Sequence, residues 1–592
     1  MISDAVSLSK IDKIYNEAVE HHKAGRLPQA EALYRNILNN NPKHADALCM
    51  LGLLAGQVGR NSDALELIKK SLAIKPDSFL AHSSMGGIYH NSYKFAEAEA
   101  AHKKALKLNP SSPEIYNNLG DVLREQGKVT EAIENYRKAL AIKPRDSVTY
   151  VNLGNAVFDT ADVVTAMKYY QKAIEINPSD RNASSNLLLM MHYDPSFSRK
   201  ALFAEARKWA EKFTPESLMA NGHDNVKDPG RKLRIGYVSG DFKNHPVGYY
   251  IETVILNHDR KNFEIYCYAN QRYGDALTLK ITQNVDQLRN ICALDDEAAA
   301  KLIIADKIDI LIDLAGHTRG NRLLLFARKP APLQITWIGY FDTTGMKSMD
   351  YILCDKYLIL EGEEKYYTEK PLYIRGCYLC LEKPDSSPAV SELPALKNGY
   401  VTFASFNNSR KLTEEVILCW AEVMSKIPHS RILLKSRVFI DKEVCKRFTL
   451  IFRQKGIGEE RIKFSGHTST EQMFAEYGEV DIAFDPFPFN GNTTTSHALF
   501  SGIPVITLSG NQYAWRMSES ILTAIGREEW VARTVAEYIE KAVTLAADFS
   551  RLAEIRKNLR NELLNSSLYD GKSFTSNLEG LYRDIWKNWC RS

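Results

Sequence analysis

The chain has 592 residues, of which 44% are hydrophobic and 25% are charged, and its formal net charge at pH 7 is +4. This length is too great for one hydrophobic core, so we expect roughly two to four domains. The ordinary composition excludes a disordered or fibrous chain, and the small net charge gives no reason to expect a nucleic-acid partner.

Cysteines and apolar segments bear on the compartment. The nine cysteines are expected to be free thiols in a reducing environment. The N-terminal sequence MISDAVSLSKIDKIY lacks the apolar stretch of a secretory signal, and no apolar run has the length of a membrane span. We therefore expect a cytoplasmic protein without a membrane span.

The N-terminal third of the chain repeats every 34 residues. The prolines on this period are Pro42, Pro76, Pro110, Pro144 and Pro178. Alanines and glycines recur in the same register, and this combination is the tetratricopeptide pattern, in which each repeat is two antiparallel helices. The small residues let the helices approach closely, and the proline ends the second helix. We predict five repeats over residues 9–178 and a degenerate sixth repeat that caps the stack.

Three asparagines fall on the same period, at Asn118, Asn152 and Asn186. Each amide has donors and an acceptor, so a row of amides along a groove can bind the backbone of an extended peptide without reading its sequence. The alternative is that each asparagine bonds within its own helices. We predict that they line an acceptor groove for polypeptide.

Strands and helices alternate in the rest of the chain. Four apolar runs predict a first parallel sheet: LRIGYVSGDF, FEIYCYAN, IDILIDLAGHT and QITWIGY. Five more predict a second: VTFASF, RILLKS, RIKFSG, DIAFD and PVITLSG. We therefore expect two Rossmann-like domains with a cleft between them. The predicted domains are the repeats at residues 1–195, a helical linker at 196–230, and the Rossmann-like domains at 231–395 and 396–592.

Polar residues follow the predicted strands, where ligands bind such sheets. His245 and His317 follow two strands of the first domain and are candidates for proton transfer. His245 could instead cap the helix that starts at Pro246. The candidates for ligand binding in the second domain are Asn408, Lys411, Lys435, Asn492, Thr493, Thr494, Thr495 and His497.

The stretch NGNTTTSH, residues 490–497, opens a helix after a predicted buried strand. Unpaired N–H groups and the helix dipole favour an anion at such a place. The alternative is an ordinary helix cap made by asparagine or threonine. Its position at the carboxyl end of a strand favours the anion site, and Lys411 would add a positive charge beside it. Lys411 could otherwise be a solvated lysine at a helix start.

Five segments carry a resemblance: GYVSGDFKNHPVGYY, DLAGHTRGNRLLLFARKPAPLQITWIGYFDTTG, FASFNNSRKL, DPFPFNGNTTTSHALFSGIPVIT and LYRDIWKNW. With the repeats, they resemble the family of protein O-glycosyltransferases that contains O-linked N-acetylglucosamine transferase and SPINDLY, and in particular its bacterial SPINDLY-like members. The resemblance covers nearly the whole chain. It implies a superhelix of tetratricopeptide repeats followed by a GT-B pair of Rossmann-like domains.

The resemblance also implies roles for single residues. Lys411 matches the lysine that contacts the donor diphosphate, and Thr493 and Thr494 match diphosphate-binding threonines. His245 matches a histidine proposed as the base. Asn408 stands where the N-acetylglucosamine enzyme has glutamine.

This sequence departs from the family pattern at two positions that the resemblance places beside the donor. Asn492 replaces a histidine, and His497 replaces an acidic residue that holds the nucleotide ribose.

The expected function is inverting, metal-independent transfer of a sugar to Ser or Thr of cytosolic proteins, without a cofactor. UDP-GlcNAc is the favoured donor. The alternatives are a protein O-fucosyltransferase that uses GDP-fucose, a flagellin-type bacterial glycosyltransferase, and a repeat scaffold with an inactive transferase domain. The expected partners are protein or peptide acceptors and the nucleotide sugar, and a homodimer through the repeats is left open.

Overall fold

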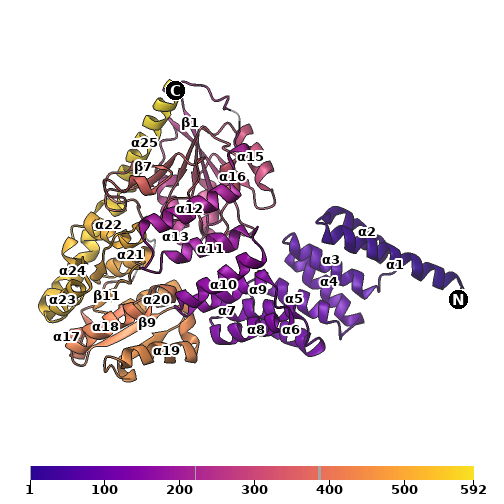
Figure 1. Cartoon of the computed structure of the whole chain (residues 1–592), viewed down its shortest axis with the longest axis horizontal. Coiled ribbons are helices and arrows are strands. Elements are labelled where there is room, and N and C mark those ends of the chain that lie inside the picture. The colour runs from indigo at the N-terminus through magenta and orange to yellow at the C-terminus, as the bar shows by residue number, and fades with distance from the viewer. Residues whose placement is uncertain (1, 221, 384–387) are drawn as a thin grey trace. The chain divides into compact units, whose positions relative to one another are not determined.

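The computed structural model describes residues 2–220, 222–383 and 388–592. The chain divides into two compact units, residues 1–157 and 158–592 (Figure 1). The four predicted segments follow the types of secondary structure, whereas the two compact units follow the contacts within the chain. The predicted boundaries therefore stay predictions. Asn221, in the predicted linker, lies outside the described residues.

Helices in antiparallel pairs form the first unit. In chain order they are α1 (Ile2–Lys23), α2 (Leu27–Asn40), α3 (Ala45–Gln57), α4 (Asn61–Ile74), α5 (Phe79–Asn91), α6 (Phe95–Leu108), α7 (Pro113–Glu125), α8 (Val129–Ile142) and α9 (Ser147–Asp159). The last two residues of α9 belong to the second unit. The repeated glycines permit close packing, since a Cβ added to Gly120 would lie 2.6 Å from the ring of Tyr136 on the paired helix.

The second unit begins with three helices that continue the chain from the repeats. They are α10 (Val163–Ile176), α11 (Arg181–Met191) and α12 (Arg199–Phe213). Helix α11 is the degenerate sixth repeat of the sequence prediction. Trp209 on α12 packs into the core of the sheet that follows.

The first sheet is parallel, with the strand order β3-β2-β1-β4-β5-β6-β7. Its strands are β1 (Leu233–Ser239), β2 (Phe263–Ala269), β3 (Gln287–Asn290), β4 (Ile310–Asp313), β5 (Leu333–Thr336), β6 (Tyr351–Cys354) and β7 (Lys370–Tyr373). The helices between them are α13 (Pro246–Asn257), α14 (Ala276–Gln283), α15 (Asp296–Ala305) and α16 (Leu323–Ala327). One face packs against α13, and the other packs against α12, α15 and α16.

The second sheet is also parallel, with the order β10-β9-β8-β11-β12-β13. Its strands are β8 (Thr402–Ser405), β9 (Arg431–Lys435), β10 (Ile462–Ser465), β11 (Ile482–Phe484), β12 (Val505–Leu508) and β13 (Val531–Ala532). Its helices are α17 (Pro394–Asn398), α18 (Glu414–Lys426), α19 (Lys442–Arg453), α20 (Thr470–Tyr477), α21 (Thr493–Phe500), α22 (Met517–Ala524), α23 (Val535–Ala546) and α24 (Phe549–Leu564). In both sheets the order reverses beside the first strand, which is where ligands bind such sheets.

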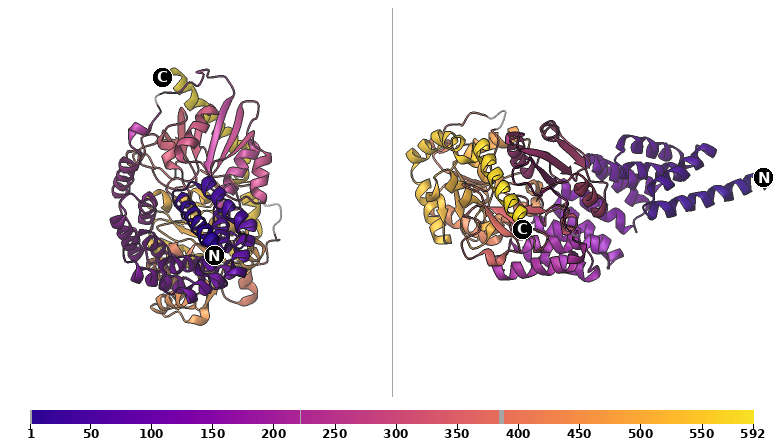
Figure 2. Two further views of the ribbon diagram at one scale, coloured as in Figure 1. Left: turned by 90° about the vertical axis from the view of Figure 1, so that its right-hand side faces the viewer. Right: turned by 90° about the horizontal axis from the view of Figure 1, so that it is seen from above.

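The chain crosses between the two Rossmann-like domains twice. The first crossing leads from β7 to α17, and the second leads from α24 to the last helix, α25 (Gly571–Arg591), which returns to the first sheet (Figures 1 and 2). There Phe574, Tyr582 and Trp586 are buried in the core that also contains α13. The two crossings are bonded to each other, because Leu381 N donates to Leu568 O at 2.8 Å.

None of the helices in the described part of the chain has the length and apolar character needed to traverse a bilayer.

Candidate active site

Lys411 lies just beyond the carboxyl end of the central strand β8, on a short 3-10 turn, η3 (Ser409–Lys411). Its Nζ donates to the carbonyl oxygen of Asn490 at 2.6 Å and lies 4.4 Å from the centre of the Phe489 ring. Burial lowers the pKa of Lys411 to about 8, although the carboxyl of Asp485 acts to raise it. Both direct contacts are with uncharged groups, so the ammonium is available to an incoming anion.

A buried carboxyl group fixes the turn that precedes α21. Asp485, which is 1% exposed, accepts a hydrogen bond from Gly491 N at 2.6 Å and another from Thr507 Oγ1 at 2.6 Å. Burial raises the pKa of Asp485 to about 6. Ser518 Oγ donates to Gly491 O at 3.2 Å from the other side. The backbone of the turn is therefore held from beneath, beside Lys411.

The two interpretations of the NGNTTTSH stretch, an anion site and a helix cap, concern the start of α21. Asn492 is the N-cap residue, and among the described residues its side chain receives no capping hydrogen bond from the first turn. The amide instead faces the first Rossmann-like domain, where its Oδ1 accepts from Tyr250 OH at 2.8 Å and its Nδ2 donates to Tyr378 OH at 2.8 Å. Within the described part of the chain, the N-cap side chain therefore leaves the first N–H groups of α21 uncapped, as an anion site would require.

The three threonines of this helix face different surroundings. Thr493 Oγ1 lies 2.7 Å from Tyr250 OH, at the boundary with the first domain. Thr494 Oγ1 donates to Asn407 Oδ1 at 2.9 Å, next to η3. Thr495 is buried and bonds Ser518 Oγ at 2.9 Å. Thr493 thus faces the first domain and Thr494 faces Asn407, whereas Thr495 is directed toward Ser518.

His245 is the N-cap residue of α13, the helix that also carries Tyr250. Its Nδ1 accepts from Val247 N at 3.3 Å and lies 3.7 Å from Asp241 Oδ2. Burial lowers the pKa of His245, and Asp241 opposes this effect. Because Nδ1 is the acceptor, the neutral ring carries its proton on Nε2. The side chain is 42% exposed, so the capping role and an available Nε2–H coexist.

His317 is fully buried and both ring nitrogens are occupied. Nε2 donates to Thr344 O at 3.0 Å, and Nδ1 accepts from Ser185 Oγ at 3.2 Å. The ring packs edge-on against Trp209, with the ring centres 4.5 Å apart, and burial lowers its pKa to about 4. This geometry joins α11 and α12 to the first sheet and leaves no nitrogen for a substrate.

Lys435 is 7% exposed and is already paired within the second domain. Its Nζ lies 2.5 Å from Glu476 Oε2 and donates to Thr468 Oγ1 at 2.7 Å. Its charge is therefore largely neutralised by the protein itself.

Asn408 and His497 border the same region. Asn408 is exposed and its Oδ1 accepts from Arg410 N at 3.1 Å, which caps η3. His497 packs edge-on against Phe474, and burial lowers its pKa to about 4, so the ring is neutral at neutral pH.

The predicted groove asparagines are all partly buried. Asn118 and Asn152 lie in the first unit and Asn186 in the second. The Nδ2 of Asn152 donates to Asn117 Oδ1 at 3.1 Å and more weakly to Asp121 Oδ2 at 3.4 Å. One amide of the row thus has local partners, and peptide binding by the row stays a prediction.

Several residues of the site were not predicted. Tyr250 and Tyr378 bond the Asn492 amide, Phe489 contacts the Lys411 ammonium, and Asp485 lies under the turn. The acid at the end of DIAFD was a signal for Asp485, because an acid that closes an apolar strand usually bonds the loop behind it. The tyrosines carry no comparable signal in the sequence.

Among the described residues, no group of three or more His, Cys, Asp or Glu side chains is placed to hold a metal ion. All nine cysteines are free thiols, as predicted. Cys377 and Cys380 have CxxC spacing, so the expectation that the chain has no such pair was wrong. Both are buried, and their sulfurs lie 3.1 Å from Ser520 Oγ and from Leu568 O respectively. Burial raises both thiol pKa values, for Cys380 to about 12, so these thiols are unreactive.

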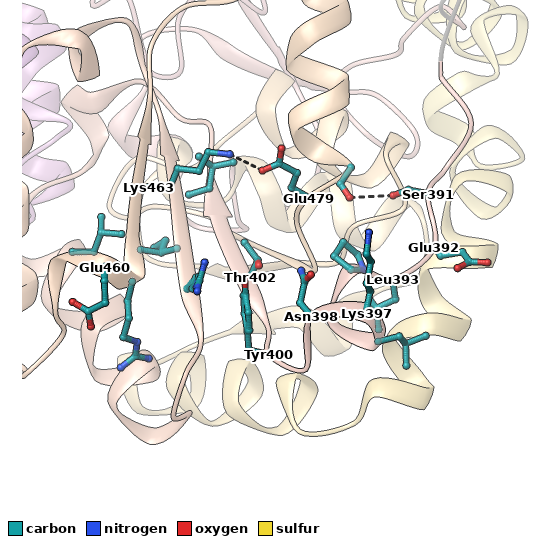
Figure 3. Close-up of a pocket in the computed structure, with 18 residues that line it drawn as sticks. Ser391, Glu392, Leu393, Lys397, Asn398, Tyr400, Thr402, Glu460, Lys463 and Glu479 are labelled. Carbon is teal, nitrogen blue, oxygen red and sulfur yellow. Dashed lines mark hydrogen bonds and ion pairs between the residues drawn. The ribbon is translucent and has the colours of Figure 1, made fainter.

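A cavity of about 670 Å³ lies at the amino ends of strands of the second sheet, on the side away from Lys411 (Figure 3). Thr402, Arg431 and Ile462, the first residues of β8, β9 and β10, line it. Lys463 and Glu479 form an ion pair of 2.6 Å at its rim. Because Lys411 and the turn before α21 follow the carboxyl ends of the strands, this cavity is not part of the site they form.

A family model for glycosyl transferase family 41 matches residues 219–388 and 389–578. The chain belongs to glycosyl transferase family 41. Tetratricopeptide-repeat models match residues 15–79, 103–134, 120–160 and 148–180. The predicted family, the glycosyltransferase class and the order of repeats followed by two Rossmann-like domains are thereby confirmed.

Two curated relatives and one solved structure illustrate the family. The probable UDP-N-acetylglucosamine-peptide N-acetylglucosaminyltransferase SPINDLY of Petunia hybrida is 37% identical over 416 residues, which are 69% of this chain and 44% of that protein. The corresponding protein of Arabidopsis thaliana is 35% identical over 417 residues, 69% of this chain and 46% of that protein. The chain thus spans less than half the length of these relatives. A mutant O-GlcNAc transferase of Thermobaculum terrenum is 34% identical, with a TM-score of 0.82 over 87% of this chain and 98% of that one.

Proposed function

We propose that the protein transfers a sugar from a nucleotide-sugar donor, with UDP-GlcNAc favoured, to Ser or Thr hydroxyls of protein acceptors. The observation that carries this proposal is the uncapped start of α21 beside the Lys411 ammonium. The printed names of the relatives, which specify UDP-N-acetylglucosamine and peptide, support the choice of donor and acceptor.

The donor diphosphate would lie on the turn at Gly491–Thr494. As the bond between sugar and diphosphate breaks, the leaving group gains negative charge. The N–H groups at the start of α21 and the Lys411 ammonium are fixed before the reaction, so they can stabilise this charge without reorganising. Such an arrangement makes a metal ion unnecessary. The acceptor hydroxyl would attack the anomeric carbon from the side opposite the leaving diphosphate, which inverts that carbon.

The charge of Lys411 depends on pH. Burial places its pKa near 8, so most molecules carry the ammonium at pH 7. A bound diphosphate opposes this lowering of the Lys411 pKa, because an adjacent negative charge favours the protonated form. The ammonium is therefore present throughout the reaction at neutral pH.

His245 would act through Nε2 at the start of α13. In the tautomer that accepts from Val247 N, the Nε2–H can donate a hydrogen bond to the acceptor or the sugar. To take the acceptor's proton instead, the ring must change tautomer and release the Val247 N–H. The 3.3 Å length of that bond makes the change inexpensive. His317 takes no part in this scheme, because both of its ring nitrogens have protein partners.

GDP-fucose is the second candidate donor. The N-acetylglucosamine enzyme that this chain resembles has an acidic residue at the place of His497, and that residue holds the ribose of the nucleotide. The neutral, partly buried His497 ring lacks this negative charge, so GDP-fucose stays a candidate beside UDP-GlcNAc.

The test is a thermal shift with UDP and with GDP, followed by measurement of nucleotide diphosphate released from each donor in the presence of peptide. A nucleotide at 100 times its Kd should stabilise the protein by about 2.7 kcal/mol. If neither nucleotide stabilises the protein and no donor releases diphosphate, the inactive scaffold is the correct interpretation.

A further inference from the structure

The turn that carries Lys411 is held from outside its own domain. Phe158 and Asp159, the last two residues of α9, lie in the second unit and contact η3. The carboxylate of Asp159 accepts from Arg410 Nε at 2.6 Å, and the Asp159 carbonyl accepts from Ser409 Oγ at 2.8 Å. The Arg410 guanidinium also lies over the Phe158 ring, 4.8 Å from its centre.

These contacts are buried and involve the two residues directly before Lys411. Asp159 is 3% exposed and Ser409 is 1% exposed. Asp159 also forms a longer ion pair, since its Oδ2 lies 3.8 Å from the guanidinium of Arg437, which follows β9. A charge-assisted bond to a buried carboxylate is stronger and more directional than a neutral surface contact. The end of α9 thus forms a polar clamp on η3 that consists of Asp159, Ser409 and Arg410.

The turn η3 has few bonds of its own. It is three residues long, and its internal backbone bonds are Lys411 N to Asn408 O at 3.0 Å and Leu412 N to Ser409 O at 2.9 Å. Within the second domain, Ser409 N donates to Ser436 Oγ at 3.2 Å. A turn this short is not stable by itself, so its partners decide where the Lys411 side chain starts.

We propose that Asp159 is a positioning residue for Lys411, through which the end of α9 sets the place of the ammonium at the donor diphosphate. This inference rests on the proposed function. Asp159 touches neither donor nor acceptor in this scheme and acts only through Ser409 and Arg410. α9 is the first helix of the fifth predicted repeat, and its last two residues belong to the same compact unit as the proposed diphosphate site.

The test compares Asp159→Asn with Asp162→Asn in the same interhelical turn. Asp162 caps α10 by accepting from Thr165 N at 3.1 Å, and asparagine caps as well as aspartate. Asp159→Asn should lower kcat by roughly 10- to 100-fold, as a small misplacement of a reacting group does, and leave KM for a short peptide acceptor unchanged. Asp162→Asn should have the kcat and the KM of the wild type.

Ser409→Ala is the milder variant, and it decides the question if Asp159→Asn fails to fold. It removes the bond to the Asp159 carbonyl and should lower kcat in the same direction by a smaller factor. Hydrogen exchange gives a second readout that does not require activity. The amides of Lys411 and Leu412 should exchange faster in both clamp variants than in the wild type.

Wild-type kcat and wild-type exchange in both clamp variants would overturn the inference, as would an equal loss of kcat in Asp162→Asn. If the wild type releases no nucleotide diphosphate from any donor, the proposed function is wrong. Faster exchange at Lys411 in the clamp variants alone would still support the positioning role in that case, so the two failures can be told apart.

Discussion

Replacing Lys411 with methionine tests the diphosphate site most directly. Methionine keeps the length of the side chain and its contact with Phe489 but removes the ammonium. A unit charge about 4 Å from a phosphate charge contributes about 4 kcal/mol at an effective dielectric constant of about 20. Only the part gained as the diphosphate leaves lowers the barrier. Loss of one oxyanion-type contact costs roughly 10²–10³ in kcat, and we expect a loss of this size.

Stability should not fall in Lys411→Met. The pKa of this lysine is lowered in the folded state, so folding disfavours its protonated form. The resulting cost is fully present below about pH 8 and disappears as the pH rises toward the unfolded pKa of about 10.4. Removing the amine removes the cost, so Tm at pH 7 should equal or exceed that of the wild type.

The assay measures diphosphate release as kcat and KM, with Lys463→Met as the matched control. Lys463 lies at the opposite edge of the same sheet, where it pairs with exposed Glu479. The control should keep wild-type turnover. A Lys411→Met enzyme whose kcat stays within about threefold of the wild type would refute the reasoning, because Coulomb stabilisation of the leaving group predicts far more.

Four further predictions follow from the site. The kcat/KM for the donor should fall as the pH rises through about 8, where Lys411 loses its proton. Asp485→Asn should move this fall to lower pH, because the Asp485 carboxyl raises the pKa of Lys411. An unchanged pH profile in Asp485→Asn would contradict the electrostatic coupling between these two residues. His245→Asn keeps a capping oxygen for α13 but removes Nε2, and initial rates should fall roughly 10²–10⁴-fold with Tm unchanged if the ring transfers a proton. Activity should survive EDTA, and activity lost to EDTA but restored by Mn²⁺ or Mg²⁺ would reveal a metal site. Changing Asn118, Asn152 and Asn186 together to alanine should remove contacts worth about 0.5–1.5 kcal/mol each for long protein acceptors but spare short peptides, and equal rates on protein acceptors would assign the row a structural role.

The repeats and most strands could be predicted because their signals are local. The 34-residue period marks every helix pair of the repeats, and long apolar runs mark strands such as β1 and β2. Four strands were missed. β7 contains Pro371 and lies at the sheet edge, where a proline does not interrupt the ladder. β3 is a polar edge strand, β6 has four residues, and β13 has two. Their pairing comes from neighbours that a short window does not show.

From the sequence, a site residue could be predicted only where its position after a strand already places it at the site. Lys411 and the start of α21 follow strands of one parallel sheet, so topology alone brings them together. His317 also follows a strand, yet its partners Ser185 and Trp209 come from α11 and α12, more than a hundred residues earlier. Lys435 likewise finds Glu476 on a separate helix. Which polar residue faces the cleft and which is consumed by packing depends on such distant partners.

The two crossings between the Rossmann-like domains restrict how these domains can move. A body joined to another by one flexible connection can swivel in any direction. A second connection removes part of this freedom, and here Leu381 and Leu568 bond the two connections to each other. Tyr378, whose hydroxyl accepts from the Asn492 amide, lies on the first crossing. Tyr250 on α13 holds the same amide from a rigid helix. The start of α21 is thus tied to the first domain at two separate points, one on a helix and one on a connection between the domains.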